Sequence, residues 1–163
     1  MSVTINRLDR LKVFLIFLHK NGIIDIGKVD EENDEGFINS LKIQKCVYLA
    51  KYYGLDLGYE YNMYIYGPYS TELSNDYYSI INNIKDYNKE VNEGFDSMNF
   101  LGVVKDKDAE WLEVAVTLLD LHVEYGRETE KLITRVYVMK DSRYSKEYIK
   151  SVYEELRRLK LIN

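Results

Sequence analysis

The sequence contains few of the residues that most often build disulfides, metal centres and active sites. Its 163 residues include one cysteine, one proline, one tryptophan and two histidines. A single cysteine excludes an internal disulfide, and these cysteine and histidine numbers are too small for a structural zinc site. A lone cysteine without a signal peptide indicates a cytoplasmic protein. The rarity of proline favours uninterrupted helices.

Several functional motifs are also missing. The longest apolar run, Val13 to Leu18, is far shorter than the ~20 residues of a membrane span. There is no glycine-rich phosphate loop and no G-x-S-x-G nucleophile elbow. His122 and Glu124 match the H-x-E of zinc deaminases, but the P-C-x-x-C partner is absent. The acidic segment Asp25–Gly36 lacks the spacing of a calcium loop and is predicted to be a loop. We therefore expect a non-enzymatic protein without a cofactor or a metal.

The composition indicates one ordinary globular domain. The chain is 30% charged and 46% hydrophobic, and its net charge of −5 argues against bulk nucleic-acid binding. We expect a single domain over residues 1–163, with an N-terminal half (1–105) and a C-terminal helical half (106–163). The sixteen tyrosines fit either rings at the rim of a helical core or a recognition surface.

The apolar periodicity predicts a mainly α fold with about six helices and one short β-strand or hairpin. The predicted helices cover residues 7–20, 41–53, 71–84, 108–125, 127–140 and 146–159. Asn39 and Ser40 are predicted to cap the second helix, and Gly54 to end it in the left-handed conformation. The strand is predicted at Tyr59–Tyr66, ended by Gly67-Pro68. Ser70 and Ser145 have the position of N-caps, and residues 85–100 are predicted to be a connector with one short helical turn.

The most specific pattern lies between Leu41 and Ile80. It consists of LKIQK and YLA on the second helix, followed by YGPYS-x-EL at residues 66–73. This arrangement of helix, strand and helix resembles the YwgA-like and Panacea (SocA-like antitoxin) group, and the C-terminal half is similar to archaeal members. The resemblance covers about a quarter of the chain. It implies a small helical domain that contacts another protein, as an antitoxin contacts its toxin.

On this resemblance, a protein partner is expected to contact a surface centred on the motif. The expected partner-binding residues are Lys45, Tyr48, Tyr66, Gly67, Pro68, Tyr69, Ser70 and Glu72. This hypothesis requires Lys45, Tyr66 and Tyr69 to be exposed on one surface. A glycine-proline corner before a capped helix equally fits a purely structural role. The sequence leaves a homodimer open.

The C-terminal residues support a second hypothesis. From Arg127 to the end there are ten Lys/Arg and six Asp/Glu, a balance of +4. Because the net charge of the whole chain is −5, residues 1–126 carry −9. Two short helices joined by a tight turn, basic on the outside, have the outline of a helix-turn-helix or winged-helix-like DNA-binding regulator. Its phosphate contacts would be Lys146, Lys150, Arg157 and Arg158. A solvated helix face with local ion pairs is the simpler interpretation.

Overall fold

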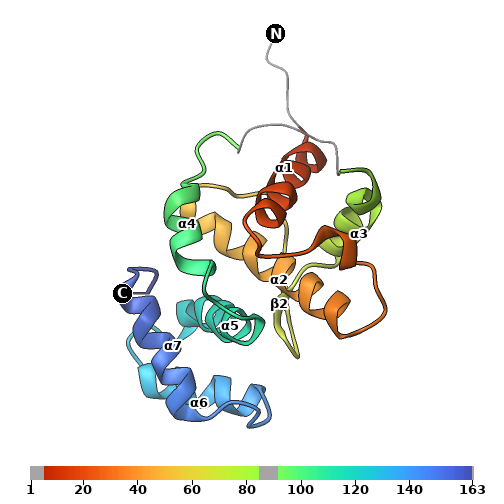
Figure 1. The fold of residues 1–163 in the computed structure, drawn as a ribbon. Helices are drawn as coiled ribbons and strands as arrows, with labels where there is room; N and C mark the ends of the chain where they lie inside the picture. Colours follow the sequence, from red (N-terminus) through yellow and green to blue (C-terminus); the bar gives the residue numbers. More distant parts are fainter. Residues whose placement is uncertain (1–5, 85–91, 163) are drawn as a thin grey trace. The chain divides into compact units, whose positions relative to one another are not determined.

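The computed structural model describes residues 6–84 and 92–162, and this part of the chain is mainly helical (Figure 1). Helices account for 66% of it when three short 3-10 helices are counted with the seven α-helices, and one two-stranded antiparallel sheet accompanies them. The prediction of a mainly α fold with a short hairpin is therefore confirmed. No helix in the described ranges is long and apolar enough to cross a membrane.

The helices are α1 (Arg7–Lys20), α2 (Asp34–Ala50), α3 (Thr71–Ile80), α4 (Ser97–Val104), α5 (Ala109–Tyr125), α6 (Thr129–Met139) and α7 (Lys146–Arg158). Three short 3-10 helices are η1 (Ile26–Lys28), η2 (Lys51–Tyr53) and η3 (Ile81–Asn83). The strands are β1 (Asn62–Tyr64) and β2 (Gly67–Tyr69).

Contacts divide the chain into two compact units. Unit 1 comprises residues 1–61 and 70–107, and unit 2 comprises residues 62–69 and 108–163. The hairpin therefore groups with the C-terminal helices rather than with its neighbours in the sequence. The expectation of a single domain stays a prediction.

The core of unit 1 is built around phenylalanine rings. Phe14 and Phe17 on α1 meet Phe95 and Phe100, with ring centroids 5.3–5.7 Å apart in the edge-on pairs. Edge-to-face contacts of this kind add to the free energy gained by burying the rings. Helix α1 also packs against α3, and α2 packs against α3. Cys46, on α2, is fully buried, and burial raises the pKa of its thiol to about 12.

Helix α2 begins one turn or more before the predicted start. Its N-cap is Asn33, whose side chain accepts a hydrogen bond from the Gly36 N–H, so the prediction of Asn39 and Ser40 as caps is wrong. Asp34 and Glu35 then occupy the first turn, where the helix dipole favours acidic residues. Part of the predicted acidic loop is therefore helical.

Asn39 instead holds the preceding loop in place. It is buried on α2, and its side-chain oxygen accepts a hydrogen bond from the Asp25 N–H at 2.8 Å. Its amide donates to the Glu35 carbonyl, also at 2.8 Å. Other caps are confirmed, because Ser70 and Ser145 cap α3 and α7 and Gly54 has a left-handed φ of 91°.

Gly67 and Pro68 form a second strand instead of ending the first. Tyr64 pairs with Gly67 and Met63 pairs with Pro68, so the chain reverses at Ile65 and Tyr66. The positive φ of Gly67, 93°, is one that glycine adopts without steric cost. Proline is tolerated because each strand of a two-stranded sheet has an edge that needs no ladder hydrogen bond.

The structure tests only part of the predicted connector over residues 85–100. Residues 85–91 lie outside the described residues. Helix α4 follows them and extends to Val104, farther than one turn, with Asp96 as its N-cap. Its Phe100 and Val104 are buried.

Unit 2 is a three-helix assembly with the hairpin attached. Helix α5 packs against α6, α7 and β2, and α6 packs against α7. Nine consecutive residues of α5, Trp111 to Leu119, are buried, as expected for a central helix. Residues 140–145 connect α6 to α7, so the helices have the predicted order of helix, turn and helix.

Two glycines allow a test of how strongly the close approach of Gly54 to the Gly94 backbone constrains the residue at position 54. Gly54 and Gly58 both have positive φ, 91° and 82°. A Cβ at position 54 would overlap the carbonyl oxygen of Gly94, whereas a Cβ at position 58 meets open space. We expect Gly58→Ala to lower the free energy of unfolding by about 1 kcal/mol. Gly54→Ala should lower it by at least about twice as much because a backbone overlap is added. Urea unfolding measures both, and equal losses would contradict a role for the Gly94 contact.

Candidate functional site

A buried ion pair lies at the centre of unit 2. Glu113, on α5, is 2% exposed, and Lys140, at the C-terminal end of α6, is 1% exposed. The Lys140 Nζ is 2.8 Å from the Glu113 Oε2. Burying two charges is costly unless the geometry is good and the remaining hydrogen-bonding positions are satisfied.

Two further donors satisfy the Glu113 carboxylate. The Arg143 Nη2 donates to Oε2 at 2.8 Å, and the Tyr144 hydroxyl donates to Oε1 at 3.1 Å. Both residues lie in the connection between α6 and α7. The carboxylate therefore ties this connection to the middle of α5.

The same cations hold the turn of the hairpin. The carbonyl oxygen of Ile65 accepts hydrogen bonds from Lys140 Nζ at 3.1 Å and from Arg143 Nη2 at 3.3 Å. The Arg143 guanidinium also lies over the ring of Tyr66, 4.9 Å from its centroid. The hairpin turn is thus anchored through its backbone and one of its rings.

Burial determines the protonation behaviour of this cluster. It lowers the pKa of Lys140, even though the carboxylate of Glu113 favours the charged ammonium. It raises the pKa of the Tyr144 hydroxyl, and the charge of Glu113 raises it further. Burial and the acidic residues Asp108 and Glu110 likewise raise the pKa of Tyr148 to about 12.

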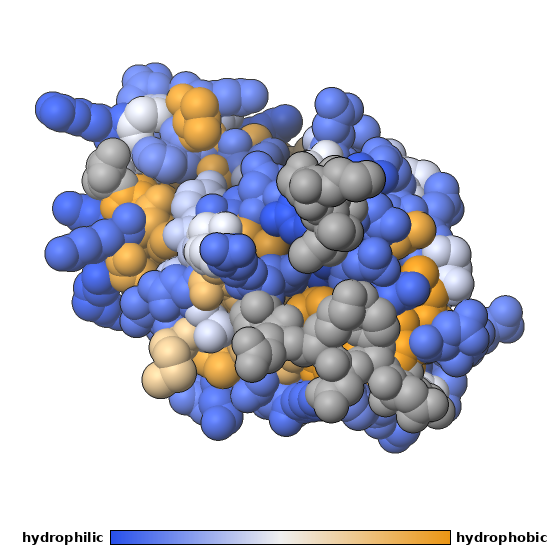
Figure 2. Space-filling model, turned by 90° about the horizontal axis from the view of Figure 1, so that it is seen from above, coloured by the Kyte–Doolittle hydropathy of each residue, from blue (hydrophilic) through white to orange (hydrophobic). Residues whose placement is uncertain are grey.

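The anchored turn carries exposed apolar side chains. We call Tyr64, Ile65 and Tyr66 the hairpin tip; their exposed fractions are 52%, 71% and 39%. Tyr64 also packs edge-on against Tyr69, with ring centroids 5.6 Å apart. Three adjacent exposed apolar residues at a turn are unusual, because turns are ordinarily polar. On the face drawn in Figure 2, hydrophilic residues prevail and hydrophobic ones gather in separate small patches.

The structure places the predicted partner-binding residues in different environments. Lys45 and Tyr48, on α2, are only 1% and 4% exposed, so the expectation that Lys45 lies on a contact surface is wrong. The second half of α2 is buried on all sides, since every residue from Ile43 to Ala50 is buried. Gly67 and Pro68 are also buried. Of the motif residues in unit 2, Tyr66 is exposed and Tyr69 is half-buried.

The end of the motif has structural contacts within unit 1. Ser70 is buried, and its backbone exchanges two hydrogen bonds with the side chain of Gln44, at 2.9 and 3.0 Å. Glu72 is exposed but pairs with Arg7, which also lies over the ring of Tyr59. These contacts fit the structural alternative for the Ser70 and Glu72 positions.

The four predicted phosphate-binding residues all lie exposed on α7. Three of them have partners within unit 2. Lys146 lies 5.3 Å from the centroid of the Tyr137 ring, Lys150 lies 3.9 Å from a Glu130 oxygen, and Arg157 lies 3.9 Å from a Glu154 oxygen. The same helix face carries Glu147 and Glu154. This mixture of charges is typical of a solvated helix face.

The Glu113 cluster is not among the sites predicted from the sequence. Its signal is a single acidic residue inside the apolar run of α5, where every neighbour is a core position. A carboxylate at such a position requires a buried cation or several donors. In the described part of the chain, no three His, Cys, Asp or Glu side chains gather closely enough to hold a metal ion.

Comparisons of the chain with protein-family models, with curated proteins and with solved structures find no match. The resemblance to the YwgA-like and Panacea group therefore stays a prediction based on the motif residues.

The ion pair gives a sharp prediction for stability. Replacing Glu113 by Gln should lower the free energy of unfolding by about 3–5 kcal/mol, because Lys140 is left as an uncompensated buried cation. The control is Glu128→Gln, which removes the exposed pair with Lys131 and should cost less than about 1 kcal/mol. Chemical unfolding compares the two. Losses of similar size would show that the buried pair has no special role.

Tyr144 makes stability sensitive to alkaline pH. Its pKa is raised in the folded state above the unfolded value of about 10. Its contribution is therefore fully present below pH ~10 and is lost as the pH rises toward the folded-state pKa. We expect the free energy of unfolding to fall as the pH rises above ~10, and less steeply in Tyr144→Phe. An unchanged slope in that variant would contradict the prediction.

Proposed function

We propose that this chain is a non-enzymatic protein-interaction domain whose contact surface is the hairpin tip. The observation that carries the proposal is the combination of exposure and anchoring at Ile65. Its side chain is 71% exposed, while its carbonyl oxygen is held by Lys140 and Arg143.

Anchoring matters because association costs conformational entropy. A loop that is already held in one conformation loses less freedom on binding, so more of its contact energy appears as affinity. Tyrosine rings add large contact area at a low rotamer cost and are enriched among the residues that dominate binding energies. Tyr64 and Tyr66 flank Ile65 and would provide such area. This arrangement supports a preformed contact surface.

The partner we propose is another protein, and the mode is an antitoxin-like binder or adaptor. The motif residues that resemble the YwgA-like and Panacea group include Tyr66 and its neighbours, which belong to or adjoin the hairpin tip.

One residue pair tests the proposed surface. Ile65→Ser removes an apolar side chain from the tip but leaves the backbone carbonyl and its two cations in place. Val123→Ser, on α5, is the matched control, since Val123 is 83% exposed and belongs to the same unit. We expect Ile65→Ser to weaken partner binding by at least about tenfold and Val123→Ser to leave it within about twofold. Both variants should unfold within about 0.5 kcal/mol of the wild type.

The measurement is capture of partners from the native cell extract by the immobilised full chain, with and without nuclease, quantified by mass spectrometry. A protein that is retained by the wild type and by Val123→Ser but lost from Ile65→Ser supports the proposal. Retention of the same protein by Ile65→Ser would place the contact surface elsewhere and overturn it.

A DNA-binding regulator is the second candidate. The observations that favour it are the +4 balance from Arg127 onward and the mutual packing of α5, α6 and α7. Phosphate contacts by Lys150 and Arg158 would make affinity for duplex DNA fall steeply between about 50 and 200 mM salt. On our primary proposal the full chain does not bind duplex DNA at about 50 mM salt. Salt-dependent binding that is weakened by Lys150→Ala and Arg158→Ala would favour the regulator instead.

A further inference from the structure

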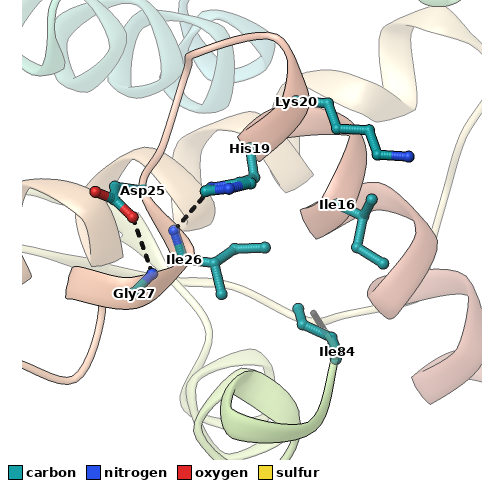
Figure 3. Close-up of a pocket in the computed structure, with 7 residues that line it drawn as sticks. All are labelled: Ile16, His19, Lys20, Asp25, Ile26, Gly27 and Ile84. Atoms are coloured by element: carbon teal, nitrogen blue, oxygen red, sulfur yellow. Dashed lines mark hydrogen bonds between the residues drawn. The ribbon is translucent and has the colours of Figure 1, made fainter. Parts of the chain in front are cut away.

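Unit 1 contains a pocket of about 390 Å³ at the C-terminal end of α1 (Figure 3). Its walls come from α1, from the chain around η1 and from the residue that follows η3. The volume lies within the range of roughly 300–1,000 Å³ that is typical of small-molecule sites. This pocket is independent of the hairpin tip, which belongs to unit 2.

Three isoleucines form the apolar part of the pocket. Ile16, Ile26 and Ile84 come from three separate segments, and their side chains point toward a common space in Figure 3. They are 7%, 4% and 0% exposed, so the accessible part of this apolar wall is small and belongs to Ile16 and Ile26, with Ile84 fully buried behind it. Branched aliphatic walls of this kind favour a short aliphatic group and offer it no hydrogen bond.

The polar part of the pocket offers donors. The His19 Nδ1 accepts the Ile26 N–H at 3.1 Å, so the neutral ring carries its proton on Nε2 and that nitrogen can only donate. Lys20, the next residue of α1, is exposed and adds an ammonium group. Asp25 also lines the pocket, but its Oδ1 accepts the Gly27 N–H at 3.0 Å. In Figure 3 it lies beside the backbone of Gly27, away from Ile16 and Ile84.

A helix C-terminus ordinarily disfavours an anion because its last carbonyl groups lack partners. Here three of the last four carbonyls of α1 are occupied. The Phe17 carbonyl accepts from the backbone and the side chain of Asn21, the Leu18 carbonyl accepts from Ile23, and the His19 carbonyl accepts from Gly22. The positive charge of Lys20 further offsets the helix dipole. This end of α1 is therefore compatible with a negatively charged ligand.

We propose that this pocket binds a short aliphatic carboxylate. The branched or linear carbon chain lies against the exposed parts of Ile16 and Ile26, close to the buried Ile84. The carboxylate accepts a hydrogen bond from the His19 Nε2–H and is attracted by the Lys20 ammonium. The pocket offers this ligand an apolar wall, a neutral donor and one cation.

The test uses the full chain with isotope-labelled isoleucine methyl groups, followed by NMR. 4-Methylpentanoate is the probe, and 4-methylpentanamide is its uncharged counterpart of nearly the same shape. We expect saturable shifts of the Ile16, Ile26 and Ile84 methyl signals with the carboxylate, and an affinity for the amide that is roughly fivefold weaker.

Two lysine variants separate specific recognition from general charge attraction. Lys20→Met keeps the aliphatic stem and removes the charge, so it should weaken carboxylate binding by roughly twofold to fivefold and leave amide binding unchanged. Lys105→Met is the matched control, since Lys105 is an exposed lysine at the C-terminal end of α4. It should change neither affinity. The proposal is overturned by the absence of saturable shifts at the three methyl groups, by equal affinities for carboxylate and amide, or by equal effects of the two lysine variants.

Discussion

The carboxylate of Glu113 connects three parts of unit 2 that are distant in the sequence. It binds Lys140, Arg143 and Tyr144, and the two cations bind the carbonyl of Ile65 in turn. The hairpin has only three residues in each strand, and an isolated hairpin of that size is marginal at best in water. Its conformation therefore depends on this cluster and on the packing of β2 against α5. A buried ionic cluster accepts few geometries, whereas an apolar contact accepts many.

Much of the fold follows from local patterns that the sequence displays. Helices α1 and α5 have long apolar stretches, α7 has a clear apolar periodicity and each has a side-chain cap, so both their existence and their approximate bounds were predictable. The start of α2 was not, because its first turns carry polar and exposed residues and Asn33 resembles any loop asparagine. The second strand was missed because Gly67-Pro68 is ordinarily a break. For the second strand, packing against α5 outweighed the local preference.

The candidate site was only partly predictable. The motif directed attention to Tyr66, but the burial of Lys45 could not be expected, since lysine is almost never buried unless it has a partner. Ile65, Glu113 and Lys140 are far apart in the sequence, with Arg143 three residues after Lys140, and no local pattern indicates that they meet. The tyrosines support both interpretations offered for their number. Tyr59 and Tyr77 are core residues, while Tyr64 and Tyr66 are exposed on the hairpin tip.

Neither unit is a continuous stretch of the chain, and this has a consequence for synthesis. Residues 62–69 leave the ribosome before α5, α6 and α7 exist. The hairpin therefore cannot pack against these helices until residues 108–163 have been made. Closing the intervening loop of residues 70–107 is entropically cheaper once that segment has folded into unit 1. Unit 1 is therefore expected to form first, and unit 2 can be completed only after residues 108–163 have left the ribosome. A nascent chain that stalls near residue 107 would expose the apolar tip without its anchors.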